Sequence, residues 1–196
     1  MEPLAFIVLK QWWLMKSAIF IERDGILNEC RVERGQQMSP RTLDDFHVNL
    51  DAREPLQRLK DAGYLLLATT NQPGISRGYL SRRELDLMHI VLRKKLPLDD
   101  VLMCTHDEMD HCPCRKPSPG LIREAAFKYH LDLDRSFVVS DKWQDAQAAH
   151  NAGCTSILLQ SPWIGKGHHD FVLPDFKSIV EKILWLAANP VAVKAA

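Results

Sequence analysis

Residues 17–25 read Ser-Ala-Ile-Phe-Ile-Glu-Arg-Asp-Gly, a short apolar run followed at once by charged residues and a glycine. An apolar run of this length, rich in β-branched and aromatic side chains, is typical of a buried strand. The Asp24-Gly25 pair that follows is a common turn sequence. The segment therefore predicts a buried strand over residues 17–21 that leads directly into a polar loop.

The rest of the chain alternates between such short apolar runs and longer segments with helical spacing. Two of the helical segments are followed by Gly63 and Gly153, as helix ends often are. This alternation of strand and helix predicts parallel pairing with right-handed crossovers. We therefore expect an α/β fold, a doubly wound and mainly parallel Rossmann-like sheet in three layers. The expected strands are 17–21, 64–69, 101–103, 137–140 and 155–159, and the expected helices are 52–62, 81–96, 118–129, 143–151 and 175–186.

The composition excludes several classes of protein. The chain has 196 residues, with 25 Lys+Arg and 25 Asp+Glu, so its formal net charge is zero. Proteins that bind nucleic acid are usually basic, and no apolar run here approaches the roughly 18 residues that span a membrane. We expect one soluble domain over residues 1–196, with no nucleic-acid partner and no membrane segment.

Residues 1–16 form an extension before the first expected strand. Lysines interrupt its apolar residues, and it lacks the basic start and small-residue cleavage site of a signal peptide. The odd number of cysteines, five, also argues against a disulfide framework. We expect the extension to pack on the domain as an extra strand or helix. The alternative is that Trp12 and Trp13 form a surface for a partner or a dimer contact.

The positions just after the expected strands are rich in polar residues. In a doubly wound sheet these positions share one rim, where ligands bind. Carboxylates there can hold Mg²⁺, attack phosphorus or transfer protons, and hydroxyl, amide and cationic groups can bind phosphoryl oxygens. Each residue alone is more often a turn, cap or surface residue, but the set together predicts phosphoryl transfer. The residues are Glu22, Asp24, Thr70, Asn71, Gln72, Arg115, Lys116, Asp141, Lys142 and Asp145.

Four segments resemble the motifs of the haloacid dehalogenase-like (HAD) phosphatase superfamily, and the resemblance covers most of the chain, from about residue 18 to 159. They are AIFIERDGILN, TTNQPGISRG, CRKPSPG and SDKWQDAQAAHNAG. The details TNQ-x-G-I-x-R-G, C-x-C-R-K-P and D-K-x-x-D are similar to the heptose-bisphosphate and histidinol-phosphate phosphatases within it. The resemblance implies a capless core and a cytoplasmic, Mg²⁺-dependent phosphatase.

The resemblance also implies a role for each polar residue at the strand ends. Glu22 falls on the nucleophile, and Asp24 falls on the general acid/base, whose backbone carbonyl also binds Mg²⁺. Lys116 falls on the lysine that neutralises the nucleophile and the phosphate. The implied Mg²⁺ ligands are Glu22, Asp24 and Asp141. The implied phosphate- and substrate-binding residues are Thr70, Asn71, Gln72, Arg115 and Lys142, with Asp145 in a supporting role.

The first motif departs from the superfamily at Glu22, because the family nucleophile is aspartate. Glutamate keeps the charge but adds a methylene group, which displaces the attacking oxygen by about a bond length. A misplacement of roughly 1 Å can cost on the order of 100-fold in rate. Three interpretations stay open: Glu22 attacks slowly, it binds Mg²⁺ and phosphate without turnover, or it is an engineered or natural lesion in an otherwise intact site.

Three of the five cysteines and a histidine form the pattern C-x-H-x5-C-x-C. Cys₃His is a standard tetrahedral Zn²⁺ ligand set that leaves no open position for chemistry. We expect Cys104, His106, Cys112 and Cys114 to hold a structural Zn²⁺ in a loop over residues 104–114, as the similar heptose phosphatases do. His111 is an alternative nitrogen ligand. Three reduced cysteines on an irregular loop are the alternative to a metal site.

These observations favour an enzyme that hydrolyses the phosphate ester of a small metabolite through a carboxyl-phosphate intermediate. A sugar bisphosphate such as a heptose bisphosphate is the expected substrate. The rival hypothesis is a catalytically inactive protein that keeps the phosphatase fold and binds phosphorylated ligands or a regulatory partner. We expect a monomer, and we expect residues 28–46 and the zinc loop to set substrate specificity.

Overall fold

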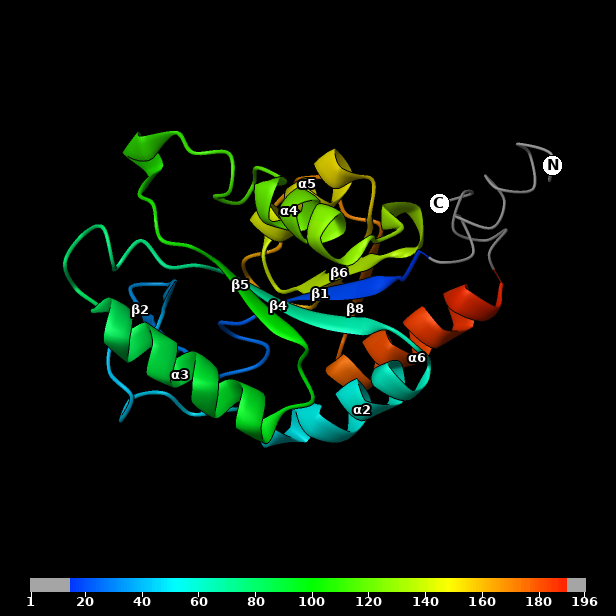
Figure 1. The fold of residues 1–196 in the computed structure, drawn as a ribbon, viewed down its shortest axis with the longest axis horizontal. Helices are drawn as coiled ribbons and strands as arrows, with labels where there is room; N and C mark the ends of the chain where they lie inside the picture. Colours follow the sequence, from blue (N-terminus) through cyan, green and yellow to red (C-terminus); the bar gives the residue numbers. More distant parts are fainter. Residues whose placement is uncertain (1–14, 190–196) are drawn as a thin grey trace, which may run out of the picture.

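The computed structural model of the chain describes residues 15–189 (Figure 1). Trp12 and Trp13 of the N-terminal extension lie outside the described residues. Six strands pair in parallel in one sheet, in the order β5-β4-β1-β6-β7-β8, which confirms the predicted doubly wound sheet. The bounds of these strands are β1 Ala18–Glu22, β4 Leu65–Asn71, β5 Asp100–Cys104, β6 Phe137–Ser140, β7 Thr155–Leu159 and β8 Phe171–Leu173.

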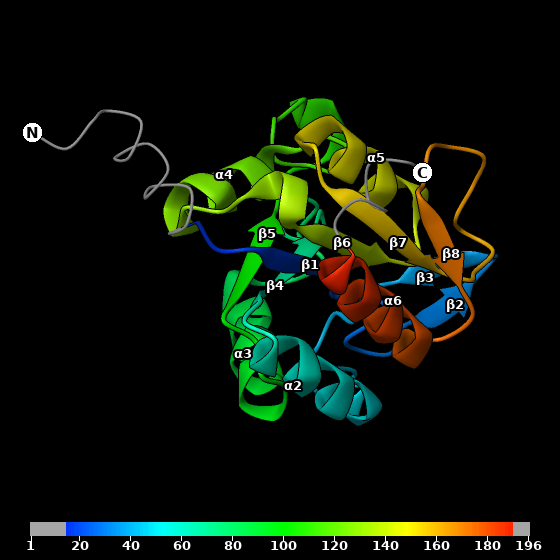
Figure 2. The same cartoon turned by 90° about the vertical axis from the view of Figure 1, so that its right-hand side faces the viewer.

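Helices cover both faces of the sheet and give three layers (Figure 2). Ile19 and Ile21 of β1 face an apolar cluster with α2, α3 and α6, whereas Phe20 faces a second cluster with α4 and α5. Successive side chains of β1 therefore enter two different cores, as the period of a strand requires. No helix within residues 15–189 is long and apolar enough to cross a membrane. The helices are α2 Arg53–Asp61, α3 Arg82–Lys95, α4 Gly120–Tyr129, α5 Trp143–Ala152 and α6 Phe176–Ala188, with short 3-10 turns at Leu50–Ala52, Glu108–Asp110 and Leu133–Arg135.

The helix ends follow from local residue chemistry. The Ser81 hydroxyl caps α3 by accepting a hydrogen bond from the amide of Glu84 at 3.1 Å. Gly63, just after α2, and Gly153, just after α5, have φ angles of 92° and 86°. Glycine adopts this left-handed conformation most readily, so both helices stop where the sequence predicts.

Three short strands are not predicted by the sequence. One is β8, which extends the sheet beside β7. The other two, β2 Arg31–Glu33 and β3 Gln36–Met38, form an antiparallel hairpin. Its turn residues, Arg34 and Gly35, have φ angles of 51° and 76°, the pattern of a tight two-residue turn. Because the hairpin is largely solvent-exposed, it lacks the apolar run that identifies a buried strand.

The strand order places β1 next to both β4 and β6. The chain runs from β1 to β4 and β5 on one side and later returns to β6 on the other, so the direction of winding reverses between β1 and β6. Ligands of doubly wound sheets bind at such a switch point, beyond the carboxyl ends of the strands. The loops after β1 and β6 are therefore the place where a site is expected.

Candidate active site

Glu22, Lys116 and Asp145 form a buried ion-pair cluster at the end of β1. The Lys116 ammonium donates to Glu22 Oε2 and to Asp145 Oδ1, the latter at 2.6 Å. None of the three residues is more than 6% exposed. Glu22 Oε1 also accepts a hydrogen bond from the backbone amide of Asp24 at 3.1 Å. The fold therefore brings the predicted nucleophile and the predicted lysine into direct contact.

Burial and charge oppose each other in this cluster. Burial raises the pKa of Glu22, and the positive charge of Lys116 offsets only part of that effect. Burial disfavours the charged form of Lys116, but Asp145 and Glu22 outweigh it and raise the pKa of the lysine overall. The ammonium is therefore the group that allows two carboxylates to share one small buried volume.

The carboxylate of Asp24 is held by several side chains at once. Arg23 Nη2 donates to its two oxygens at 2.8 and 3.0 Å, and Gln72 Nε2 and Ser39 Oγ each donate to Oδ2 at 2.7 Å. Thr70 Oγ1 lies 3.5 Å from the same oxygen. Burial acts to raise the pKa of Asp24, but Arg23 and Ser39 outweigh it, and the pKa is lowered to about 2. Asp24 is thus ionised at neutral pH, the state that accepts a proton.

Arg23 is fully buried beneath the site. Its Nη1 lies 3.1 Å from Nε2 of His89 on α3, and its guanidinium lies 5.5 Å from the centre of the Phe46 ring. Burial and the charge of Arg23 lower the pKa of His89 to about 4, so the imidazole is neutral and accepts the hydrogen bond. Arg23 and His89 therefore hold the Asp24 carboxylate in place. The sequence does not predict this role, because a single arginine in a turn is usually a surface residue.

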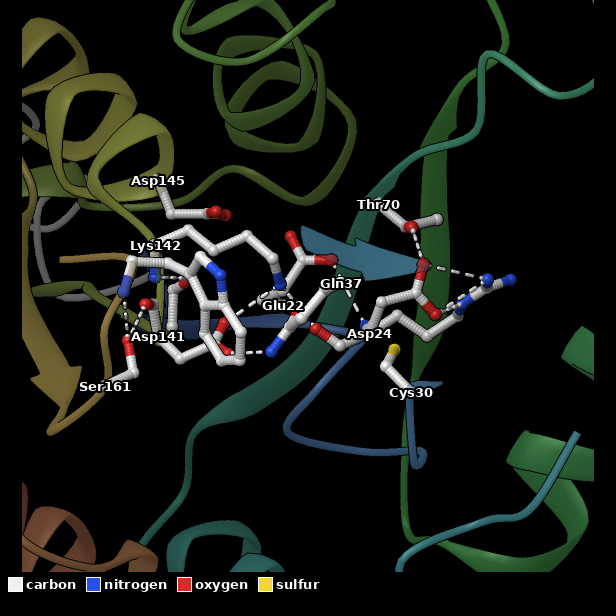
Figure 3. Close-up of polar contacts among 12 residues, drawn as sticks. Glu22, Asp24, Cys30, Gln37, Thr70, Asp141, Lys142, Asp145 and Ser161 are labelled. Atoms are coloured by element: carbon white, nitrogen blue, oxygen red, sulfur yellow. Dashed lines mark hydrogen bonds and ion pairs between the residues drawn. The ribbon is translucent and has the colours of Figure 1, made fainter. Parts of the chain in front are cut away.

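Two oxygens of the implied Mg²⁺ ligands converge on one cationic group. Lys142 Nζ lies 2.6 Å from the backbone oxygen of Asp24 and 2.9 Å from Asp141 Oδ1. Figure 3 shows these residues in one cluster with Glu22. Burial opposes ionisation of Lys142, but the charges of Glu22 and Asp141 raise its pKa above the usual value. Carboxylate and carbonyl oxygens gathered around a positive charge are the hard ligands that Mg²⁺ prefers, so the residues present fit that ion.

The three predicted phosphate-binding residues at the end of β4 take part in hydrogen bonds within the protein. The Asn71 amide exchanges two hydrogen bonds with the backbone of Lys116, at 3.1 and 3.2 Å. Gln72 donates to Thr70 Oγ1 at 2.8 Å, and both side chains contact Asp24. Asn71 lines the cavity described next, whereas Thr70 and Gln72 are buried and do not.

A cavity of about 680 Å³ opens over the cluster. Glu22, Lys116, Lys142 and Arg115 are among the residues that line it. Trp143, the first residue of α5, is 41% exposed and contributes an aromatic surface. A concave site of this size with a few convergent charged groups is typical of a small-molecule binding site.

The hairpin and the residue that follows it supply two site residues that the sequence does not single out. Ser39 donates to Asp24, and Gln37 Nε2 donates to Asp141 Oδ2 at 2.5 Å. Both side chains line the cavity. The available signal is Gly35, because a glycine within a polar stretch marks a turn that can reverse the chain toward the rim.

The Cys/His pattern forms a compact cluster at the end of β5. The ligand atoms of Cys104, His106, Cys112 and Cys114 all lie within 4.8 Å of one another. The sulfur–sulfur distances are 3.3 to 3.6 Å, and His106 Nδ1 lies 3.3 Å from Cys114 Sγ. A tetrahedral ion with Zn–S bonds of about 2.3 Å requires sulfurs roughly 3.8 Å apart, so the donor set fits zinc. His111 lines the cavity instead and is not part of the cluster.

Comparisons with known proteins agree with this geometry. The HAD-hydrolase-like family model matches residues 113–176. The D-glycero-beta-D-manno-heptose-1,7-bisphosphate 7-phosphatase of Helicobacter pylori strain J99 is 34% identical over 175 residues, which covers 86% of this chain and 96% of that protein. The enzyme of the same name from Pseudomonas aeruginosa is 31% identical over 159 residues, which covers 79% of this chain and 85% of that protein. Among solved structures, the crystal structure of D,D-heptose 1,7-bisphosphate phosphatase from B. bronchiseptica, complexed with magnesium and phosphate, matches with a TM-score of 0.74. The two sequences are 29% identical, and the match covers 86% of this chain and 98% of that one.

A doubly wound sheet with these charged groups at its carboxyl rim defines a phosphoric monoester hydrolase of the HAD-like class. Within that class, the chain belongs to the family of the heptose-1,7-bisphosphate 7-phosphatases. The resemblance stated from the motifs is therefore confirmed, as is the predicted HAD-like fold.

Proposed function

We propose that the protein is a Mg²⁺-dependent phosphatase that removes one phosphate group from a heptose bisphosphate. The observation that carries the proposal is the contact between Glu22 and Lys116, which both line the cavity, together with the oxygens of Asp24 and Asp141 that accept from Lys142. The names of relatives up to 35% identical support the substrate. A small sugar bisphosphate also suits a cavity of about 680 Å³.

The reaction proceeds in two steps. Glu22 attacks phosphorus, the bond from phosphorus to the sugar oxygen breaks, and Asp24 gives that oxygen a proton, which it takes up from solvent when the phosphate dianion binds beside it and raises its pKa. Water then attacks the carboxyl phosphate, Asp24 takes the proton from that water, and inorganic phosphate leaves. Lys116 balances the negative charge of Glu22 and of the transferring phosphoryl group. Glu22, the Asp24 carbonyl oxygen and Asp141 would hold Mg²⁺, which would supply positive charge for the phosphoryl oxygens.

Arg115 and Lys142 provide the remaining positive charge for the substrate. Arg115 lies on the cavity wall and pairs with exposed Glu108 at 3.2 Å, a contact that a phosphate can replace. Such weak surface pairs cost little to exchange. We assign to these two cations the recognition of the substrate's phosphates, with Thr70, Asn71 and Gln72 supporting the rim.

The direct test is phosphate release from D-glycero-β-D-manno-heptose 1,7-bisphosphate. We expect slow release that is absent in buffer without added divalent ions and returns when Mg²⁺ is added, because the carboxylates that line the cavity need a counter-ion to accept a phosphate. A sugar monophosphate and a nucleotide serve as substrate controls. The proposal fails if neither the protein nor its Glu22→Asp variant releases phosphate from the bisphosphate.

The ion pair at Glu22 favours a second candidate, a protein that binds phosphorylated ligands without turnover. Both carboxylate oxygens of Glu22 already accept hydrogen bonds, from Lys116 and from the amide of Asp24. These two bonds restrain the carboxylate in its present orientation. Vanadate separates the two candidates: vanadate binding, seen as a raised melting temperature, combined with no phosphate release from a broad ester panel supports the binding protein.

We also propose that the loop over residues 104–114 holds a structural Zn²⁺. We expect about one equivalent of zinc per purified chain by elemental analysis, and under half an equivalent contradicts the site. Cys112→Ser should lose zinc and unfold at a lower temperature, because ligand binding is coupled to folding of the loop. Cys30→Ser is the matched control and should keep its zinc, since Cys30 lies outside the cluster.

We place the protein in the cytoplasm as a monomer, as the sequence predicts. None of the five cysteines, all of which fall within the described residues, forms a disulfide. Reduced thiols together with a zinc loop suit a reducing compartment. The net charge of zero favours a small-molecule partner over nucleic acid.

A further inference from the structure

We propose that Gln37 is a positioning residue of the Mg²⁺ site: its amide nitrogen holds Asp141, and its amide oxygen accepts a hydrogen bond from a water bound to the ion. The inference rests on the proposed function, because it assigns Mg²⁺ to Asp141. Gln37 lies on β3 of the hairpin, outside the four sequence motifs, so no motif assigns it a role.

The first observation concerns the orientation of Asp141. Gln37 Nε2 donates to Asp141 Oδ2 at 2.5 Å, and Lys142 Nζ donates to Oδ1 at 2.9 Å. The Asp141 carboxylate, only 2% exposed, therefore has a donor on each oxygen and cannot turn freely. Carboxylates that bind metals are commonly fixed by such outer hydrogen bonds, and these partners strongly affect affinity for the metal.

The second observation concerns the other end of the amide. Gln37 Oε1 is buried and finds no hydrogen-bond donor among residues 15–189. If the side-chain amide were flipped, Gln37 Oε1 would face the negatively charged Asp141 Oδ2 and repel it. The orientation with Nε2 toward Asp141 is therefore the favourable one. Buried carbonyl oxygens without a donor are rare. Because Mg²⁺ usually keeps several bound waters, one of them could donate a hydrogen bond to this acceptor beside Asp141.

The third observation is that the backbone is shaped to admit Gln37. Gly25 has a φ of 98°, and a Cβ atom there would lie 2.8 Å from Asp141 Oδ2, 2.8 Å from Gln37 Nε2 and 3.0 Å from Gln37 Oε1. Trp163 Nε1 also donates to the backbone oxygen of Gly35 at 3.0 Å, which fixes the hairpin turn. Gln37 is thus held against the Asp24-Gly25 turn and Asp141, where the Mg²⁺ ligands lie.

The test measures the affinity of the zinc-loaded protein for Mn²⁺, a paramagnetic substitute for Mg²⁺, by electron paramagnetic resonance. Gln37→Met keeps the side-chain length but removes both polar groups, and should weaken Mn²⁺ binding about tenfold or more. Gln36→Met is the matched control, because Gln36 is the exposed neighbour on the same strand, and its affinity should stay within twofold.

A second readout separates positioning from general damage. Phosphate release by Gln37→Met should be low at limiting Mg²⁺ and recover as Mg²⁺ is raised, whereas a fold defect would not be rescued in this way. Affinity of Gln37→Met within twofold of the unchanged protein, or an equal loss in Gln36→Met, overturns the inference. Asp141→Asn distinguishes the two failures: if it leaves Mn²⁺ affinity unchanged, the metal site of the proposed function is itself wrong.

Discussion

Replacing Glu22 by aspartate is expected to raise the rate of phosphate release by on the order of 100-fold. The glutamate side chain is one methylene longer than the family's aspartate, and its two oxygens accept hydrogen bonds from Lys116 and from the Asp24 amide. Shortening it draws the attacking oxygen back toward β1 and returns it to the distance for which the rest of the site is arranged. The measurement is kcat for heptose bisphosphate at saturating Mg²⁺.

The matched control for this substitution is Glu22→Gln. It keeps the length of glutamate but removes the charge, so no carboxyl phosphate can form and turnover should disappear. Mass spectrometry after rapid acid quench should find the phosphoryl group on residue 22 in the aspartate variant. Equal rates for Glu22→Asp and the unchanged protein would show that side-chain length does not limit the reaction, and the nucleophile assignment would then be wrong.

Lys116→Met is expected to abolish phosphate release and to lower the free energy of unfolding by about 3–5 kcal/mol. The lysine is the common partner of Glu22 and Asp145, and all three are buried. Removing it leaves two buried carboxylates without their counter-charge, and both must take up protons or repel each other. Urea unfolding at neutral pH and again at pH 5 measures the effect, which should shrink at the lower pH as Glu22, whose pKa burial raises, is protonated.

Lys128→Met is the matched control for the loss of a paired lysine. Lys128 is bonded to Asp100 at 2.9 Å, but its side chain is 55% exposed. Exposed pairs contribute about 0–1 kcal/mol, so this variant should unfold close to the unchanged protein and keep its activity. If the two lysine variants lose similar stability, the ion pairs of Lys116 do not hold the site together as we propose.

The outline of the fold could be predicted because strand and helix leave distinct periods in the sequence. β6 and β7 coincide with the predicted apolar runs at residues 137–140 and 155–159. Strands buried between two layers of helices need such continuous apolar residues. The hairpin β2–β3 and the edge strand β8 have no such run. Their pairing depends on contacts with distant loops, such as the Trp163 bond to the turn at Gly35.

The members of the site could be predicted better than their contacts. Glu22, Asp24 and Lys116 are identified by their positions after strands and by the motif resemblance, and Glu22 and Lys116 meet at the rim. The sequence does not show that the Asp24 carboxylate is bonded to Arg23, nor that Lys142 joins the Asp24 carbonyl oxygen to Asp141. Such partners depend on which way each side chain points after folding.

Residue order alone therefore determined the parallel sheet, the rim that gathers the charged groups and the three cysteine ligands of the metal cluster, because these depend on local spacing and on the position of residues after strands. Tertiary structure decided that His106 rather than His111 joins the three cysteines, and that Gln37 reaches Asp141 from a hairpin. The physical reason is the sequence distance over which the two kinds of interaction act. Spacing constrains residues a few positions apart, whereas the hydrogen bonds that orient side chains in the folded protein come from segments up to 128 positions away.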